Sequence, residues 1–174
     1  MSTVLDASPF VLDSKKVTEA NVVIGVHCKN EHFNDPRVAY CAVCGISMTQ
    51  ATRRPVLGCR PPLGVLVLDD GAMRALDRDH VIGRDPAEDR AVAEGRSAGI
   101  TVDDPMVSRV HARVTLDEWD VCVVDAGSTN GTYVWSPGQP NWRRLAPGEA
   151  ARLRPGSAVS FGTRQFNYHS YRHL

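Results

Sequence analysis

The sequence has few lysines and no excess of charge of either sign. Lysine occurs only at positions 15, 16 and 29, and the rest of the twenty basic residues are arginine. Twenty acidic residues balance them, so the formal net charge is zero. A neutral chain has no overall field that would attract nucleic acid or an anionic membrane surface. Any site for an anion must therefore be local.

The chain also lacks long apolar runs. None approaches the ~20 residues that a membrane-spanning helix needs, and the amino terminus lacks the charged and apolar regions of a signal peptide. We therefore expect a cytoplasmic protein with no membrane partner. Five cysteines at uneven spacing agree with this, because an odd number in a reducing compartment indicates metal ligands and packed thiols rather than disulfides.

Length and proline positions suggest how the chain is divided. A chain of 174 residues that is 43% hydrophobic can build one domain with a sizeable core plus a small appendage. Prolines at 55, 61 and 62 can continue neither a helix nor a central strand. We therefore expect four parts: a flexible tail at 1–26, a small module at 27–50, a linker at 51–62 and the main domain at 63–174.

Two close pairs of metal-ligand residues lie in the small module. Cys41 and Cys44 enclose two residues, and Cys28 and His32 enclose three. Four such ligands satisfy tetrahedral zinc with no open position, which is typical of a structural site. The segment resembles a zinc ribbon of the kind found in front of other domains. It is too short to bury its own core, so bound Zn²⁺ would hold it folded.

Other interpretations of this segment are available. His27 or Cys59 could replace His32 as a ligand. A Cys-x-x-Cys pair alone could also be a thioredoxin-type redox motif, but no strand-to-helix junction is visible around Cys41. Nucleic-acid binding would require a basic face with aromatic groups, and residues 27–48 offer only Lys29 and Arg37 as basic side chains. We therefore do not expect nucleic acid as the partner.

After residue 63 the sequence shows short strands broken by turns, with no convincing amphipathic helix. Alternating or β-branched segments predict strands at 64–68, 72–76, 80–82, 100–102, 110–116, 119–125, 132–135, 142–145, 151–153, 157–161 and 165–169. Many short strands with regular turns indicate an all-β sandwich. Cys122 lies in one of them and is expected to be a buried thiol.

Polar residues suited to a phosphate follow three of these strands. A phosphate monoester carries close to two negative charges, so its receptor needs a guanidinium and several donors from rigid loops. The sequence supplies Gly83-Arg84, then Ser108-Arg109-Val110-His111, then Ser128-Thr129-Asn130-Gly131. This resembles the forkhead-associated (FHA) phosphothreonine-binding domain, whose pattern is Gly-Arg, Ser-x-x-His and an Asn-Gly turn in that order. The resemblance covers residues 63–174.

The resemblance implies a fold, a function and a role for each residue. The fold would be an FHA-like β-sandwich of short antiparallel strands. The function would be that of a phosphothreonine-dependent adaptor in Ser/Thr kinase signalling, which binds threonine-phosphorylated proteins. The phosphopeptide would be bound by Arg84, Ser108, Arg109, Thr129 and Asn130, of which Asn130 holds the peptide backbone and Arg109 gives support. The geometry of the loops would be supported by Gly83, His111 and Gly131.

The sequence departs from the FHA pattern in one segment, and it also permits one rival function. The segment 85–107 is longer than the usual family loop and flanks the site, so its shape would influence which residues beside the phosphothreonine are favoured. Ser108, His111 and Asp125 could also be taken for a hydrolase triad. Ser108 lies in no nucleophile elbow, and its closeness to His111 in sequence hinders the required geometry. We therefore expect a binding protein and not an enzyme.

Overall fold

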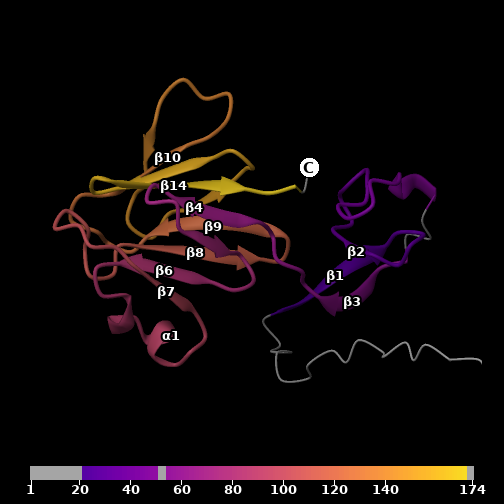
Figure 1. The fold of residues 1–174 in the computed structure, drawn as a ribbon, viewed down its shortest axis with the longest axis horizontal. Coiled ribbons are helices and arrows are strands. Elements are labelled where there is room, and N and C mark those ends of the chain that lie inside the picture. Colours follow the sequence, from indigo (N-terminus) through magenta and orange to yellow (C-terminus); the bar gives the residue numbers. More distant parts are fainter. Residues whose placement is uncertain (1–20, 51–53, 172–174) are drawn as a thin grey trace, which may run out of the picture.

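The computed structural model describes residues 21–50 and 54–171 and contains two modules (Figure 1). A sandwich of two β-sheets holds the later part of the chain, and a small three-stranded module lies beside it. The fold is all-β, as the alternating segments predicted. Within the described ranges, no helix is long and apolar enough to cross a membrane.

The small module consists of one antiparallel sheet and a small buried cluster. Strand β1 (Val22–His27) pairs with β2 (Phe33–Asn34) on one side and with β3 (Val56–Cys59) on the other. A 3₁₀ turn spans Met48–Gln50. The buried apolar cluster of this module consists of Val26, Cys28, Val38, Cys41 and Met48. Residues 1–20 of the tail that we expected at 1–26 lie outside the described residues.

Strand β3 lies inside the segment that we predicted to be a linker. The prolines at 55, 61 and 62 flank the strand and do not interrupt it. The four residues of β3 keep their backbone N–H groups and pair with β1 from Val22↔Cys59 to Gly25↔Val56. The small sheet therefore includes part of the segments predicted as tail and linker.

The sandwich is built from two sheets of short strands. One has the order β11-β10-β13-β14-β4-β5 and the other β12-β9-β8-β6-β7. The first sheet contains β4 (Val65–Leu68), β5 (Met73–Ala75), β10 (Thr132–Trp135), β11 (Arg143–Arg144), β13 (Ala158–Phe161) and β14 (Arg164–His169). The second contains β6 (His80–Gly83), β7 (Ala98–Thr101), β8 (Ala112–Asp117), β9 (Asp120–Asp125) and β12 (Ala150–Leu153).

One strand pair is parallel, which the sequence did not predict. All pairs in the two sheets are antiparallel except β6 with β7. A parallel pair needs a crossover of a dozen or more residues, and residues 84–97 supply it. They form a 3₁₀ turn at Pro86–Glu88 and a single helical turn, α1 (Arg90–Ala93).

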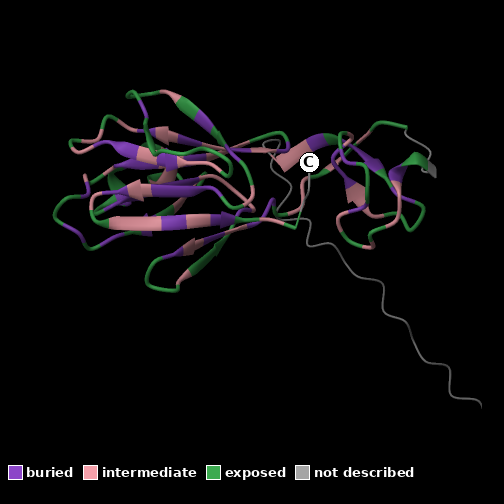
Figure 2. Ribbon diagram, turned by 90° about the horizontal axis from the view of Figure 1, so that it is seen from above, coloured by how far each residue is buried: buried purple, intermediate pink, exposed green. Residues whose placement is uncertain are grey.

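Alternation along the strands directs apolar side chains into the space between the sheets. In β9, Val121 and Val123 are buried while the residues between them are half-buried. Figure 2 shows the same change between buried and less buried residues along the strands of the sandwich. Phe161 and Phe166 contribute the largest fully buried side chains, and their rings lie 6.0 Å apart.

The small module packs against the β8–β9 turn. The indole of Trp119 donates a hydrogen bond to the Ile24 carbonyl at 2.8 Å, and its ring lies 5.4 Å from that of Phe33. Arg37 pairs with Asp35 at 2.7 Å and with Asp120 at 2.9 Å. These contacts place the module at one end of the β8–β9 hairpin.

Candidate functional site

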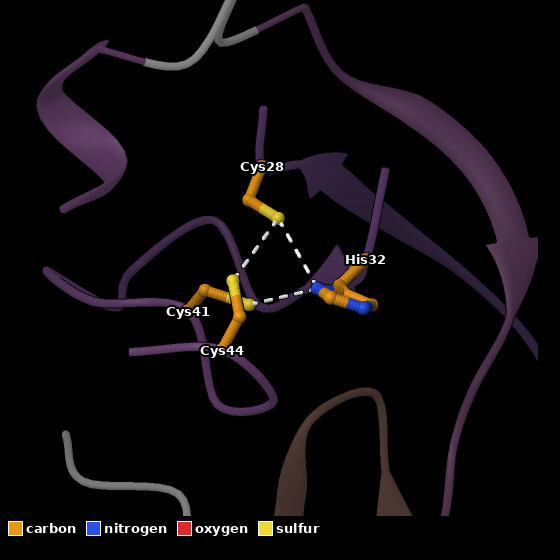
Figure 3. A group of neighbouring side chains, drawn as sticks. All are labelled: Cys28, His32, Cys41 and Cys44. Atoms are coloured by element: carbon orange, nitrogen blue, oxygen red, sulfur yellow. Dashed lines mark hydrogen bonds between the residues drawn. The ribbon is translucent and has the colours of Figure 1, made fainter. Parts of the chain in front are cut away.

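Four side chains of the small module converge on one point (Figure 3). Cys28 and His32 come from the β1–β2 turn, and Cys41 and Cys44 come from the loop that follows β2. Their ligand atoms all lie within 4.8 Å of one another, with 3.5 Å from Cys28 Sγ to His32 Nδ1 and 3.8 Å from Cys28 Sγ to Cys44 Sγ. Metal–ligand distances of about 2.0 to 2.3 Å in a tetrahedron give ligand separations of roughly 3.3 to 3.8 Å. This group could bind a metal ion.

The alternative ligands lie outside this group. Within the described residues, the cluster that could hold a metal contains neither His27 nor Cys59. The His27 ring lies 5.4 Å from the Phe33 ring instead. Cys59 ends β3 and is exposed. The structure therefore brings together the four residues that the spacing predicted.

Asn34 connects the two turns that carry the ligands, and the sequence analysis did not identify it. Its side chain is fully buried and donates to the His32 carbonyl at 2.6 Å and to Cys41 Sγ at 3.5 Å. Its Oδ1 accepts a hydrogen bond from Ala42 N at 2.9 Å. An asparagine between two ligand pairs is the feature of the sequence that could have indicated this role.

Cys41 is placed where a thiolate is favoured. Burial raises the pKa of its thiol, but hydrogen bonds from the backbone of Cys44 and Val43 and from the Asn34 amide outweigh burial and lower that pKa to about 6. Burial raises the pKa of Cys28. Metal binding requires thiolates, so the donors around Cys41 favour the ligating form.

Three loops of the sandwich meet around a second site. They follow β6, β7 and β9 and carry the Gly-Arg, Ser-x-x-His and Ser-Thr-Asn-Gly residues. A cavity of about 380 Å³ lies between them, lined by Arg84, Glu88, Ser108, Arg109, Val110 and Thr129. Four of the five residues expected to bind a phosphopeptide therefore line one cavity.

Arg84 is held by its own loop with the end of its side chain exposed. Its Nε donates to the Val107 carbonyl at 2.6 Å, and its backbone N–H donates to the Ser108 carbonyl at 3.0 Å. Within the described residues, no ion pair or hydrogen bond engages the two terminal nitrogens of this guanidinium. A guanidinium that is positioned through Nε and exposes two parallel N–H groups is suited to bidentate contact with an anion.

Ser108, Thr129 and Asn130 join the second and third loops. The Ser108 hydroxyl accepts a hydrogen bond from Thr129 N at 3.1 Å, which leaves its own proton available for a ligand. The Asn130 side chain lies outside the cavity lining, and its amide donates to the Met106 carbonyl at 2.7 Å. Asn130 thus contacts the neighbouring loop in the absence of a ligand.

His111 is buried between the same two loops. Its Nδ1 accepts a hydrogen bond from Ser108 N at 3.0 Å, so the proton lies on Nε2, which donates to the Gly131 carbonyl at 3.2 Å. Burial lowers the pKa of this imidazole. The neutral ring therefore fixes the distance between the loops.

Gly83 permits a close approach of two backbone segments. A Cβ atom at this position would lie 1.8 Å from the Arg109 carbonyl oxygen, a distance that no side chain tolerates. Arg84, which directly follows the end of β6, is thereby brought against the second loop.

Asp125 organises the third loop. From the sequence it was named only as the acid of a hydrolase triad. Its buried carboxylate accepts hydrogen bonds from Ser128 Oγ at 2.5 Å and from Thr132 Oγ1 at 2.7 Å. Burial raises its pKa, but these donors outweigh burial and lower it.

Both ring nitrogens of His111 contact backbone groups, so His111 links neither to the Ser108 hydroxyl nor to Asp125. The arrangement is not that of a Ser-His-Asp triad. An aspartate three residues before a serine is a turn signature that could have indicated this role.

The comparison with protein families agrees with the three-loop pattern. Residues 80–162 match the sequence model described as FHA domain. The match agrees with the FHA resemblance of the three motifs. The matched segment includes all three loops.

One protein of known sequence and several solved structures are similar to parts of this chain. The chain is 44% identical over 57 residues to the protein FraH of Nostoc sp., which is 33% of this chain and 18% of FraH. The chain therefore spans less than a fifth of the length of that relative.

A solved FHA domain studied for phosphothreonine-dependent interactions is 26% identical, with a TM-score of 0.45 over 63% of this chain and 96% of that one. The FHA domain of the CT664 protein from Chlamydia trachomatis is 25% identical, with a TM-score of 0.48 over 62% and 97%.

Proposed function

From the FHA domain at residues 80–162 we propose that this protein is an adaptor that binds threonine-phosphorylated proteins. The partners would be substrates of Ser/Thr kinases, and the binding would be reversible and without turnover. The observation that carries the proposal is the exposed guanidinium of Arg84, held through Nε beside the Ser108 hydroxyl in one cavity. An odd number of cysteines, three of them in one candidate metal cluster, is typical of a reducing compartment, which supports a place in the cytoplasm.

The residues would divide the recognition of the ligand among them. Arg84 and the Ser108 hydroxyl would contact the phosphate, and Thr129 would add a donor. The Asn130 amide would exchange its contact with Met106 for the backbone of the peptide. Arg109 would add positive charge at the cavity wall, since it is exposed there.

Titration of a fluorescent phosphothreonine peptide against Arg84→Ala tests this proposal. A charge-assisted hydrogen bond contributes roughly 1.5 to 3 kcal/mol, and each ~1.4 kcal/mol is tenfold in affinity. We therefore expect a loss of about ten- to hundredfold, while Arg74→Ala, an exposed arginine on the edge strand β5, should bind like the parent. Peptides with threonine or glutamate in place of phosphothreonine should bind poorly, because they offer fewer acceptors and less charge. Parental binding by Arg84→Ala would place the site elsewhere.

For the small module we propose a structural zinc ion bound by Cys28, His32, Cys41 and Cys44. Three sulfur atoms and one imidazole nitrogen at tetrahedral spacing support zinc in a closed site. Metal analysis should find close to one zinc per chain. Cys41→Ser should lose the metal, and Cys59→Ser should keep it. Purified protein without zinc after expression in zinc-replete, reducing conditions would contradict the assignment.

Nucleic-acid binding by the small module gains no support from the contacts. Arg37 is engaged by Asp35 and Asp120, and Arg60 donates to the carbonyls of Leu116 and Glu118. These two arginines are therefore engaged within the protein and do not gather on a basic face of the kind that nucleic-acid recognition requires.

A further inference from the structure

The long segment after Arg84 is fixed against the sandwich at two points. At its start, Asp85 N donates to the Arg109 carbonyl at 3.0 Å. Four residues later the buried carboxylate of Asp89 accepts two hydrogen bonds from Arg113, at 3.0 and 2.5 Å, and a third from Ala91 N. The residues between these anchors form the 3₁₀ turn that contains Glu88. Glu88 is therefore held at a defined place.

That place is the wall of the phosphate cavity. Glu88 lines the cavity together with Arg84 and Arg109, and its Oε1 accepts a hydrogen bond from Arg109 Nη1 at 2.5 Å. Its side chain is 41% exposed, which leaves the carboxylate accessible to a bound molecule. Among the described residues its Oε2 has no hydrogen-bond partner.

A carboxylate at this position cannot itself bind a phosphate. Two arginines and one glutamate leave a local charge of about +1 facing a ligand that carries close to −2. The second oxygen of Glu88 is thus a free acceptor beside a phosphate that repels it. A cation beside the phosphate would be attracted by both the phosphate and the Glu88 carboxylate, and an anion there would be repelled by both.

We propose that Glu88 determines specificity by favouring ligands with a basic side chain, and disfavouring those with an acidic one, next to the phosphothreonine. This inference rests on the proposed phosphothreonine binding. It assigns a role to the segment in which the chain departs from its family, because the 3₁₀ turn of that segment supplies the carboxylate.

The test compares two sets of peptides on the full chain. The peptides share one phosphothreonine core and carry a single lysine or a single glutamate at each position from three before to three after it. At the position that faces Glu88, the parent should prefer lysine to glutamate by about two- to tenfold, because an exposed charge pair is worth at most about fivefold in affinity and the exchange replaces attraction by repulsion. Glu88→Gln should bring this ratio close to one, and Glu88→Lys should reverse it.

The ratio is the informative quantity because Glu88 also contacts Arg109. A change in the contact between Arg109 and the phosphate is common to all peptides, so it cancels between lysine and glutamate peptides. Glu94→Gln is the matched control, because Glu94 lies in the same segment but pairs with Arg90 and Arg96 and does not line the cavity. It should keep the parental ratio.

Two results would overturn the inference, and they are distinguishable. If Glu88→Gln binds phosphopeptides with the parental lysine-to-glutamate ratio at every position, Glu88 does not set specificity while the proposed function stands. If the parent binds no phosphopeptide in either set, the proposed function fails and the inference fails with it.

Discussion

At the scale of single residues, the buried imidazole of His111 gives the clearest link between protonation and the geometry of the loops. The neutral ring accepts from Ser108 N, and protonation of Nδ1 would break this bond. Because burial lowers the pKa of His111 below the ordinary value of 6.5, the unfolded chain binds this proton more readily than the folded one. The contribution of His111 to stability is therefore complete above about pH 6.5 and is lost as the pH falls towards the lowered pKa.

Nuclear magnetic resonance of the imidazole resonances tests this prediction. The His111 signals should titrate with a midpoint below 6.5, and the ring should stay in the Nε2–H form at pH 7. A midpoint at or above 6.5 would contradict the interpretation of His111 as a neutral spacer between two loops.

Asn34 gives a second prediction at this scale. Its amide joins the His32 carbonyl, Cys41 Sγ and Ala42 N, so it orients both ligand pairs. Loss of such an outer contact typically costs about ten- to hundredfold in metal affinity. Asn34→Ala should therefore release zinc to a competing chelator at a correspondingly lower concentration. Asn30→Ala, which changes an exposed side chain in the same turn, should match the parent; equal zinc retention in both variants would contradict the role of Asn34.

At the scale of elements, the end of β6 depends on the absence of a side chain at Gly83. Gly83→Ala would force a Cβ atom to within 1.8 Å of the Arg109 carbonyl unless the second loop moves. Overpacking of this kind costs about 1 to 3 kcal/mol, and movement of the loop separates Arg84 from Ser108. Urea unfolding should show the lost stability, and peptide titration should show weaker binding. Parental values in both measurements would show that the loop adapts without cost.

The strands of the sandwich could be predicted from the sequence because their signal is local. Alternation along 120–125 and 165–169 identifies β9 and β14 without knowledge of their partners. The pairing of β3 with β1 could not be predicted, because Pro55 and Pro61 dominate the local pattern and the partner lies more than thirty residues away. The parallel pairing of β6 with β7 likewise depends on the path of the crossover between them.

The same distinction applies to the candidate site. Arg84, Ser108 and Thr129 could be predicted because each stands beside a strand end in a recognisable motif, and the four residues of the candidate metal cluster follow from their spacing. Glu88 could not be predicted, because its contact with Arg109 joins residues 21 positions apart. That contact exists only because Asp85 and Asp89 fix the turn between them against the sandwich.

At the scale of the whole molecule, the β8–β9 hairpin connects the two modules. The loops before β8 and after β9 line the cavity that contains Arg84, and Trp119 in the turn between the two strands contacts the small module. Val23 of the small module belongs to the core of the sandwich, and Phe33 packs against that core. Removal of the metal should therefore affect the sandwich through Trp119.

Removal of zinc by a chelator should lower the melting temperature of the sandwich and leave phosphopeptide affinity unchanged below that temperature. Loss of the Val23 and Phe33 contacts corresponds to about 1 to 2 kcal/mol, or roughly 5 to 10 °C for a domain of this size.

Intrinsic fluorescence should shift to longer wavelength as Trp119 becomes exposed. The shift should disappear in Trp119→Phe and persist in Trp142→Phe, because Trp142 is already 44% exposed. An unchanged melting temperature would mean that the modules are energetically independent, and weaker phosphopeptide binding would mean that the hairpin transmits the loss to the cavity.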